Sequence, residues 1–371
     1  MPTFQRHALS NYASANHIYR APYASKASFM GLCIAYMAAI LIGGWSLVTK
    51  ALAREPQTLA VDAPTEVTGE DAVNALNGVF GRHAKERGSH AKGFCIAGEF
   101  ALSEVGASYL RNGIQQRGPV FVVGRFSIGG GNPAASDKGR SVRGLAVRME
   151  FEDSDILDLV MISAPVFFAS TPQQFVEFLK VRTADPETGN KDPEKIAAFN
   201  RANPNVMAHL DYVSQTPPPA SYASTPYFST HAFLFGNEDG PMQAARWHFE
   251  PVEGFRGLTP DQEKEFPDSF LEDELHARLA NGPVSWNASL QLAGEEDDIN
   301  DPTAVWSAPR ETFIEVGRLD ISRTIEPGAS DDCTGQVFDP NNLSEGIHPT
   351  DDPILAIRRP AYAVSFGRRV Q

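Results

Sequence analysis

Two stretches of the 371-residue chain, GPVFVVGRFSI at 118–128 and RGLAVRMEF at 143–151, indicate its fold most clearly. Both are rich in β-branched and aromatic residues and are bounded by glycine, proline or aspartate, as is typical of strands. In VSWNASLQLA at 284–293, apolar and polar residues alternate, which predicts a strand with one buried face. Further runs of the strand type are DILDLVMISAPVFF at 155–168, YFSTHAFLF at 227–235 and ARWHFEP at 245–251.

Helical patterns lie before, between and after these strands. At 71–81, apolar residues recur at helical spacing behind Asp71, which we take as the N-cap. Two further helices are predicted at 172–180 and within 267–282. Strands that dominate the middle of a chain, with helices inserted between them, favour the α+β class. We therefore expect an antiparallel sheet or barrel with helical insertions.

The N-terminal part carries a candidate membrane anchor. Residues 29–48, FMGLCIAYMAAILIGGWSLV, contain no charge over the length that a helix needs to cross a bilayer. No acidic residue precedes Glu55, whereas five lysines and arginines do. The cations before the run keep the N-terminus cytoplasmic. A signal peptide cleaved after Ala-Leu-Ala at 51–53 is the alternative, and a buried core helix is a third reading. The predicted division is a cytoplasmic segment at 1–28, a transmembrane or signal-anchor helix at 29–48, a linker at 49–70 and an exported domain at 71–371.

The remainder of the chain is strongly acidic. Subtracting the five N-terminal cations from 32 leaves 27 basic residues against 46 acidic ones, a net charge of −19 from residue 55 onward, which argues against nucleic acid as a partner. Of the three cysteines, Cys33 lies in the apolar run. Cys95 and Cys333 lie beyond it and have no zinc-binding spacing. A disulfide framework is not expected.

RGSHAKG at 87–93 holds a candidate proton-transferring group, His90. An imidazole can accept and return a proton near neutral pH, because its unperturbed pKa is about 6.5. A hydrogen-bonded core histidine is the plainer reading of an isolated histidine. The glycines at 129–131 match no nucleotide-binding loop, and Ser127 lies in no GxSxG motif, so neither supports a nucleotide or hydrolase site.

DDPILAIRRPAY at 351–362 predicts a helix capped by Asp352 or by the aspartate before it. Arg358 and Tyr362 are four residues apart and therefore share one helix face. A guanidinium beside a phenol lowers the phenol's pKa and favours the phenolate, which is the form that binds ferric iron. A surface cation-π pair is the other reading, and Pro360 between the two residues should weaken or kink the helix.

Together these segments resemble the haem catalase family, and most closely its short branch of catalase-related peroxidases. The resemblance covers residues 71–371 and implies a catalase-like antiparallel β-barrel with surrounding helices, a haem b cofactor and hydrogen peroxide as substrate. The segments that carry it, in the family's order, are RGSHAKG, GRFSI with RGLAVRMEF, APVFF, YFSTHAFLF, and FDPNNLSEGIHPTDDPILAIRRPAY with its closing FGRR.

The resemblance also implies roles for individual residues. His90 would transfer the proton on one face of the haem, and Ser127 would hydrogen-bond its ring. Tyr362 would be the iron ligand on the other face, with Arg358 as its partner. The other implied cofactor-binding residues are the propionate-binding Arg87, Arg125 and Arg369, the ring-stacking Phe175, and the relay residues His231 and Asp352. An ordinary core role stays open for Phe175 and His231.

The chain departs from the family at one functional position. True catalases carry an asparagine before the PVFF segment, whereas this chain has Ile162 or, one residue on, Ser163. Loss of that amide should impair dismutation more than the first cleavage of peroxide. We therefore expect a peroxidase that uses a small organic electron donor, exported or membrane-anchored, and compatible with a homo-oligomer. The alternatives are a fatty-acid hydroperoxide-converting enzyme and a non-catalytic, membrane-tethered haem-binding protein.

Overall fold

The computed structural model describes residues 66–109, 118–151, 155–236, 241–306 and 312–371. The first four strands pair antiparallel in chain order, each with the next. They are β1 (Gly93–Leu102), β2 (Val120–Ile128), β3 (Arg143–Glu150) and β4 (Ile156–Ile162). The two stretches that open the sequence analysis are therefore neighbouring strands, and glycine, proline and polar residues lie between them.

Four more strands close this sheet into a barrel. They are β5 (Tyr227–Phe228), β7 (Gln243–Pro251), β8 (Val284–Leu292) and β9 (Phe313–Ile325). Among the described residues, eight antiparallel strands form the ring β1-β2-β3-β4-β5-β7-β8-β9, since β9 pairs back with β1. Two short strands, β6 (Phe233–Phe235) and β10 (Ile347–Pro349), extend the sheet beside β7. The predicted antiparallel barrel is confirmed.

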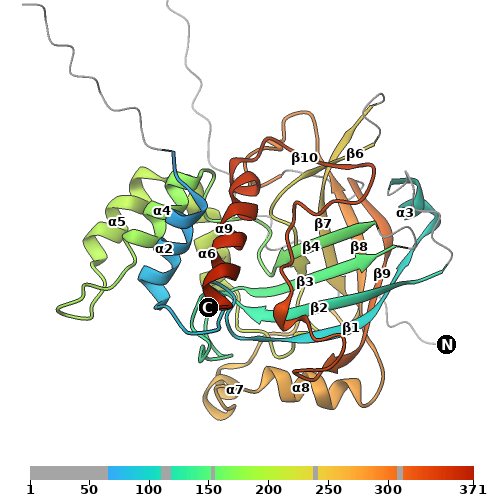
Figure 1. The fold of residues 1–371 in the computed structure, drawn as a ribbon, viewed down its shortest axis with the longest axis horizontal. Coiled ribbons are helices and arrows are strands. Elements are labelled where there is room, and N and C mark those ends of the chain that lie inside the picture. Colours follow the sequence, from blue (N-terminus) through green and yellow to red (C-terminus); the bar gives the residue numbers. More distant parts are fainter. Residues whose placement is uncertain (1–65, 110–117, 152–154, 237–240, 307–311) are drawn as a thin grey trace, which may run out of the picture. The chain divides into compact units, whose positions relative to one another are not determined.

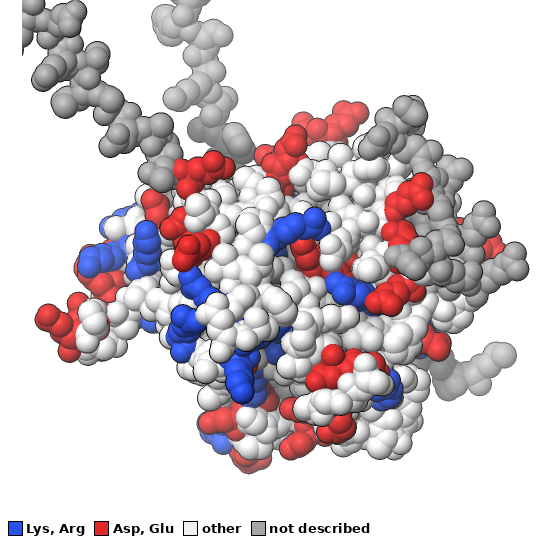
Figure 2. Space-filling view, in the orientation of Figure 1, with Lys and Arg blue, Asp and Glu red and all other residues white. Residues whose placement is uncertain are grey.

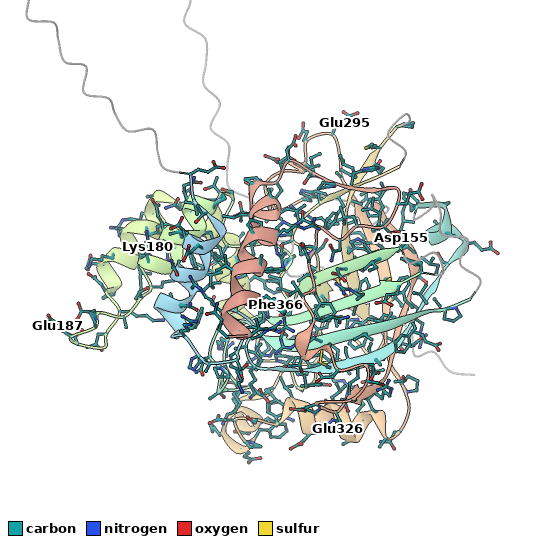
Figure 3. The ribbon with its side chains drawn as sticks, viewed as in Figure 1. Asp155, Lys180, Glu187, Glu295, Glu326 and Phe366 are labelled. Atoms are coloured by element: carbon teal, nitrogen blue, oxygen red, sulfur yellow. A yellow bond between two sulfur atoms is a disulfide. The ribbon has the colours of Figure 1, made fainter. Side chains whose placement is uncertain are left out.

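Large apolar side chains fill the barrel. Phe126, Trp247, Phe249 and Trp286 are at most 1 % exposed, and in β8 every second residue from Val284 to Leu290 is buried, as the sequence alternation predicts. Figure 3 shows side chains occupying the space between the strands, so the barrel is a packed core and not an open channel. Chemistry therefore has to take place outside the barrel, where loops and helices meet the sheet.

Helices lie against the outside of the barrel. Figure 1 shows α9 between the barrel and a group formed by α2, α4, α5 and α6, while α7 and α8 lie along another side of the barrel. The group has its own apolar cluster, which includes Val176, Phe178 and Phe199. The helix bounds are α2 Gly69–Phe80, α3 Glu104–Tyr109, α4 Pro172–Lys180, α5 Pro193–Ala202, α6 Met207–Gln215, α7 Pro260–Glu265, α8 Leu271–Leu279 and α9 Pro353–Arg369.

One predicted helix N-cap needs correction, and one is confirmed. Thr68, not Asp71, is the N-cap of α2; the Thr68 hydroxyl accepts from Asp71 N–H and the Asp71 carboxylate accepts from Thr68 N–H, so each satisfies an otherwise unpaired donor. α9 begins behind its predicted N-cap Asp352 and runs through Pro360 without ending. A side chain on Gly69 would lie 2.5 Å from the backbone of Pro360, so α2 packs closely against α9 at this point. Pro360 has no backbone N–H, so α9 lacks one helical hydrogen bond there.

The stretch YFSTHAFLF forms two short strands, β5 and β6, instead of one. The chain leaves the ladder between them because the Ser229 hydroxyl accepts from Trp247 N–H and donates to His231 C=O.

Cys95 and Cys333 form a disulfide, which corrects the expectation that none occurs. The two residues are 238 positions apart in sequence, but the fold brings their Cα atoms within 5.7 Å. The spacing of the cysteines in the sequence could not reveal this pair, because the two residues meet only where the segment after β9 lies beside β1.

The predicted anchor at 29–48 lies outside the described residues. Within the part of the chain that the structure describes, no helix has the length and apolarity needed to cross a membrane. The described residues belong to one unit, Asp62–Gln371. The predicted domain boundaries remain predictions.

Candidate functional site

His90 is held in an unusual position just before β1. Its backbone is left-handed, with φ 55°, a conformation that is rare outside glycine and that clusters at functional sites. Its Nδ1 lies 2.9 Å from the Ser127 hydroxyl near the end of β2, so the predicted contact is present. A Cβ at Gly144 of β3 would lie 2.5 Å from that hydroxyl and 2.7 Å from His90 Nδ1. The missing side chain at position 144 therefore makes room for the pair.

The imidazole of His90 is neutral at physiological pH. Burial, followed by the positive charges of Arg125, Arg358 and Arg87, lowers its pKa from 6.5 to about 3. When Nδ1–H donates to the Ser127 hydroxyl oxygen, Nε2 keeps its lone pair. The side chain is then a proton acceptor of fixed orientation.

Ile162 and Ser163 are the two residues that the resemblance places where an amide is expected, and the structure separates them. Ile162 stands opposite Gly144 in the β3–β4 ladder, and directly opposed residues share one face of a sheet. That face is the one on which Gly144 contacts His90. Ser163 follows the strand, and its hydroxyl accepts from Arg143 N–H at 2.9 Å. Of the two candidates, Ile162 is therefore the neighbour of His90, and it offers no hydrogen-bond donor.

Arg358 and Tyr362 meet on α9 as their spacing predicts. Arg358 Nε donates to the Tyr362 hydroxyl at 3.0 Å, and Nη2 of the same guanidinium donates to it as well. The phenol oxygen thus faces two N–H donors of one guanidinium. The cation-π contact of the other reading is present too, since the Arg358 guanidinium carbon lies 5.3 Å from the centroid of the Tyr362 ring. Both side chains are half-buried, so the pair is not a freely exposed one.

His231 and Asp352 form a buried pair beside the start of α9. His231 Nδ1 lies 2.6 Å from Asp352 Oδ2, and both residues are at most 2 % exposed. The other oxygen of Asp352 accepts from two backbone N–H groups as the N-cap. Burial lowers the pKa of His231, the Asp352 carboxylate opposes this, and the Arg358 charge lowers it further. The charge of Arg358 thus acts on His231. Among the described residues, no direct hydrogen bond joins Arg358 to the His231–Asp352 pair.

Phe175 lies on α4 within a cluster of phenylalanines. Its ring stacks on Phe167, with centroids 6.2 Å apart and an angle of 9° between the planes, and it also contacts Phe168. Phe167 in turn lies 6.5 Å from the His231 ring. The core role and the ring-stacking role are both compatible with this position.

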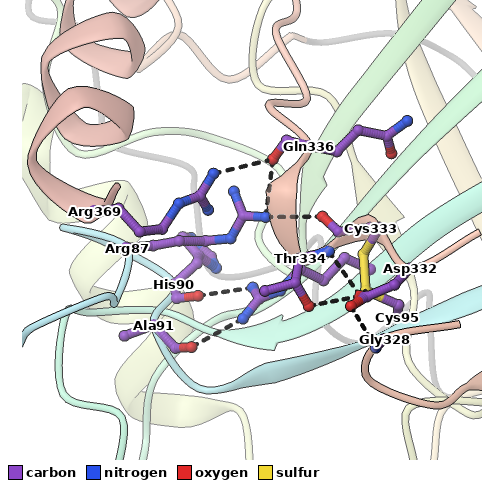
Figure 4. Close-up of a disulfide and its surroundings, with 11 residues drawn as sticks. Arg87, His90, Ala91, Cys95, Gly328, Asp332, Cys333, Thr334, Gln336 and Arg369 are labelled. Carbon is purple, nitrogen blue, oxygen red and sulfur yellow. Dashed lines mark hydrogen bonds between the residues drawn. A yellow bond between two sulfur atoms is a disulfide. The ribbon is translucent and has the colours of Figure 1, made fainter. Parts of the chain in front are cut away.

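Three arginines gather at the start of β1 and the end of α9. Arg125 donates to the backbone carbonyls of His90 and Ala91, at 2.7 and 2.9 Å. Arg87 and Arg369 both donate to the carbonyl of Gln336, at 3.0 and 3.5 Å. Figure 4 shows Arg87 and Arg369 reaching the same carbonyl oxygen, and Figure 2 shows basic side chains gathered near the C-terminal end of α9.

Among the described residues no carboxylate lies within ion-pair distance of this arginine cluster (Arg87, Arg125 and Arg369), although the more distant charge of Glu86 raises the pKa of all three. Burial lowers the pKa of Arg87 to about 9 and that of Arg125 to about 10, and in both the charge of Arg369 adds to the effect. Guanidinium groups held together by carbonyl oxygens form a site for a ligand with more than one negative charge.

The loop that carries His90 also contacts α9. Gly88 N–H donates to the Ser365 hydroxyl at 3.2 Å. In addition, Arg358 acts on the pKa of His90, and Tyr362 acts on the pKa of Arg87. Groups from near residue 90 and from the last twenty residues of the chain therefore lie within electrostatic reach of one another.

Sequence reasoning missed the residues that make this geometry possible. A Cβ at Gly93 would lie 2.8 Å from the Arg125 guanidinium, and Gly144 clears space for His90. A glycine inside a strand is the signal that could have identified both, since it marks close approach of another group. The disulfide gave no signal in the spacing of the cysteines.

Comparison with known proteins agrees with this geometry. The chain matches the family model described as Catalase over residues 57–370. It is 35 % identical to a catalase-related peroxidase of Synechococcus elongatus over 310 residues, which cover 83 % of this chain and 91 % of that protein. A catalase-related peroxidase of Mycolicibacterium paratuberculosis is 31 % identical, over 82 % of this chain and 95 % of its own length.

The fold agrees as well. The structure of catalase A from Saccharomyces cerevisiae superposes with a TM-score of 0.69 at 22 % identity, over 78 % of this chain and 62 % of that one. The chain thus spans less than two thirds of that larger protein. By sequence, by barrel topology and by the matched length, the chain belongs to the catalase family.

Proposed function

We propose that this protein is a haem peroxidase that reduces hydrogen peroxide, or an organic peroxide, with electrons from a small organic donor. The observation that carries the proposal is the neutral His90 imidazole, hydrogen-bonded to Ser127 and within electrostatic reach of the Arg358–Tyr362 pair. The names of the two curated relatives support the peroxidase activity.

Haem b fits the residues present. The Tyr362 oxygen, which accepts from two donors of one guanidinium, would be the ligand to the iron, and the arginine cluster, which has no carboxylate within ion-pair distance among the described residues, suits two propionates. The buried His231–Asp352 pair would support the tyrosine side. When bound, haem supplies the iron centre at which the peroxide is reduced and the donor's electrons are received.

His90 would move the proton that makes the first cleavage possible. Its Nε2 accepts a proton from one oxygen of hydrogen peroxide and returns it to the other, so that a water molecule can leave. Ser127 keeps the ring oriented during both transfers. The whole reaction consumes one peroxide, two electrons and two protons from the donor, and yields two water molecules.

Reduction by an organic donor is favoured over dismutation. In dismutation a second peroxide has to be oriented as reductant, and an amide donor beside the histidine helps to do this. Here the matching position holds Ile162, whose side chain can donate no hydrogen bond. Hydrogen peroxide therefore serves as oxidant more readily than as reductant.

We also propose that the domain works outside the cytoplasm. The apolar run at 29–48 and the cation bias before it support export, and the Cys95–Cys333 disulfide is typical of an oxidising compartment. Protease is added to cells whose outer layers have been opened but whose cytoplasmic membrane is intact. It should digest the domain. Protection equal to that of a cytoplasmic marker would contradict this location.

Replacing His90 tests the proposed reaction. His90→Ala should retain haem, because the arginine cluster and Tyr362 remain, but lose about a hundredfold or more of the peroxide-consumption rate. His83→Ala is the matched control, since His83 is exposed and, among the described residues, its ring is bonded to the carbonyl of Phe80 alone. An unchanged rate in His90→Ala would defeat the assignment. Bound haem without turnover would indicate a carrier, and preference for a fatty-acid hydroperoxide would indicate a hydroperoxide-converting enzyme.

A further inference from the structure

The disulfide joins two parts of the chain that touch the arginine cluster. Cys95 lies on β1, and Cys333 begins the short 3-10 turn Cys333–Gly335 in the connection after β9. Both residues are at most 5 % exposed, and they pack with Phe338 in a small apolar cluster on the outside of the barrel. Figure 4 shows the disulfide beside Arg87, His90 and Arg369.

On the β1 side, the disulfide adjoins Arg125. Cys95 stands directly opposite Arg125 in the β1–β2 ladder, so both side chains leave the same face of the sheet. Arg125 is in turn bonded to the carbonyls of His90 and Ala91, which lead into β1. The position of this arginine is therefore fixed by the strand that holds Cys95.

On the other side, the disulfide fixes the carbonyls that hold the remaining two arginines. Arg87 donates to the carbonyls of Cys333 and Gln336, and Arg369 donates to that of Gln336. The turn itself is built by Asp332, which accepts from Thr334 and Gly328. These local bonds shape the turn, and Arg148 of β3 also donates to the carbonyl of Val337, the residue after Gln336, at 2.9 Å.

Further anchors of this connection lie on either side of the turn. Before it, Arg323 of β9 pairs with Asp331; after it, Asp158, which pairs with Arg148 on the barrel, accepts from the backbone N–H of Asp339 and the side chain of Asn342. At the turn itself, the disulfide adds a covalent tie to β1. Without it, the two carbonyls would be held less firmly, and the like-charged arginines, which repel one another, could move apart.

We propose that the Cys95–Cys333 disulfide positions the arginine cluster for a ligand with two carboxylates, so that retention of haem depends on the oxidised state of this pair. The proposal rests on the proposed function. It assigns the two cysteines a positioning role, because neither touches the ligand. Reduction by a dithiol breaks the S–S bond, delivers two electrons and two protons to form two thiols, and turns the dithiol into its own disulfide.

The test compares two porphyrins on the full-length protein. Haemin carries both carboxylates, whereas haemin dimethyl ester carries none. The affinity of each is measured by absorption titration for the native protein, for Cys95→Ser/Cys333→Ser, and for native apoprotein that was reduced and freed of reductant without oxygen. Far-UV circular dichroism checks that each form is folded.

Loss of the disulfide should weaken haemin binding by about tenfold or more and leave ester binding unchanged within about twofold. The serine variant should show no further change on reduction. The Arg87→Gln variant is the matched control, since removing the disulfide from it should lower haemin affinity by a smaller factor than in the native chain.

An equal loss of affinity for both porphyrins overturns the proposal, because it would indicate that the disulfide has a general structural role. Unchanged haemin affinity in both the variant and the reduced protein overturns it as well. If the native, oxidised protein binds neither porphyrin, the proposed function itself fails, and that outcome is distinct from the other two. Should the serine variant not fold, the reduced native protein gives the same comparison.

Discussion

Replacing Gly144 by alanine should disable the proposed proton transfer without replacing any group that moves a proton. The added Cβ would lie 2.7 Å from His90 Nδ1 and 2.5 Å from the Ser127 hydroxyl, whereas ordinary contact begins at 3.4 Å. If the backbone stays in its ladder, the ring has to retreat by about 0.7 Å and the hydroxyl by about 0.9 Å, the differences between these distances. The 2.9 Å bond between them cannot survive both displacements unchanged.

The substitution should lower the rate of peroxide consumption and leave haem affinity unchanged. A misplacement of this order lowers a reaction that needs defined geometry by about tenfold to a hundredfold. The three atoms nearest the new methyl group belong to Ser127 and His90, not to Tyr362 or the arginine cluster, so haem affinity should be retained. Overpacking should also lower the free energy of unfolding, by about 1–3 kcal/mol.

Stopped-flow measurement of peroxide consumption, at matched haem content, checks this expectation. Gly367→Ala is the control, because a Cβ there meets nothing within 4 Å and alanine is favourable inside a helix. A Gly144→Ala protein with bound haem and a full rate would show that the close approach of His90, Ser127 and Gly144 has no part in the chemistry. Loss of haem would refute the claim that the cofactor is held elsewhere.

Three further outcomes follow from the same geometry. Ile162→Asn should raise oxygen release from hydrogen peroxide by about tenfold or more, because it supplies an amide beside His90. An oxygen electrode measures the release, and an unchanged rate would contradict the role of Ile162. Tyr362→Phe removes the oxygen that Arg358 holds and should speed haem transfer to an acceptor protein by about tenfold or more, whereas an unchanged transfer rate would rule out Tyr362 as ligand. Because the pKa of His90 is lowered to about 3, the rate of peroxide consumption should stay level from about pH 8 to pH 5 and fall only as protonation sets in near pH 3; a midpoint near 6.5 would contradict the burial of this group.

The sequence predicted the barrel where strand patterns are strong and failed where they are weak. β2, β3, β7 and β8 have β-branched or aromatic runs with clear boundaries, and each prediction was confirmed. β1 reads GFCIAGEFAL and β9 reads FIEVGRLDISRTI, and neither was predicted. Glycines and charged residues interrupt both patterns. These strands are defined by pairing with each other and with their neighbours, which is information that a local pattern does not contain.

The candidate site was predictable in its residues but not in its supports. His90 with Ser127, and Arg358 with Tyr362, could be paired from motifs, and the structure brings both pairs together. The carbonyl of Gln336 could not be predicted, because a backbone acceptor leaves no mark in the sequence. The same limit applies to long-range pairs such as the disulfide, whose partners meet only once the barrel has closed.

The arginine cluster links cofactor binding to the protonation state of His90. Arg125 and Arg87 help to keep this imidazole neutral, and the same two guanidiniums are the groups proposed to bind the haem carboxylates. Carboxylates that neutralise them would weaken one cause of the lowered pKa. Burial is the larger cause, however, and a ligand placed over the ring only increases it. His90 is therefore ready to accept a proton both before and after the cofactor is in place, so the acceptor does not have to be created by the binding event.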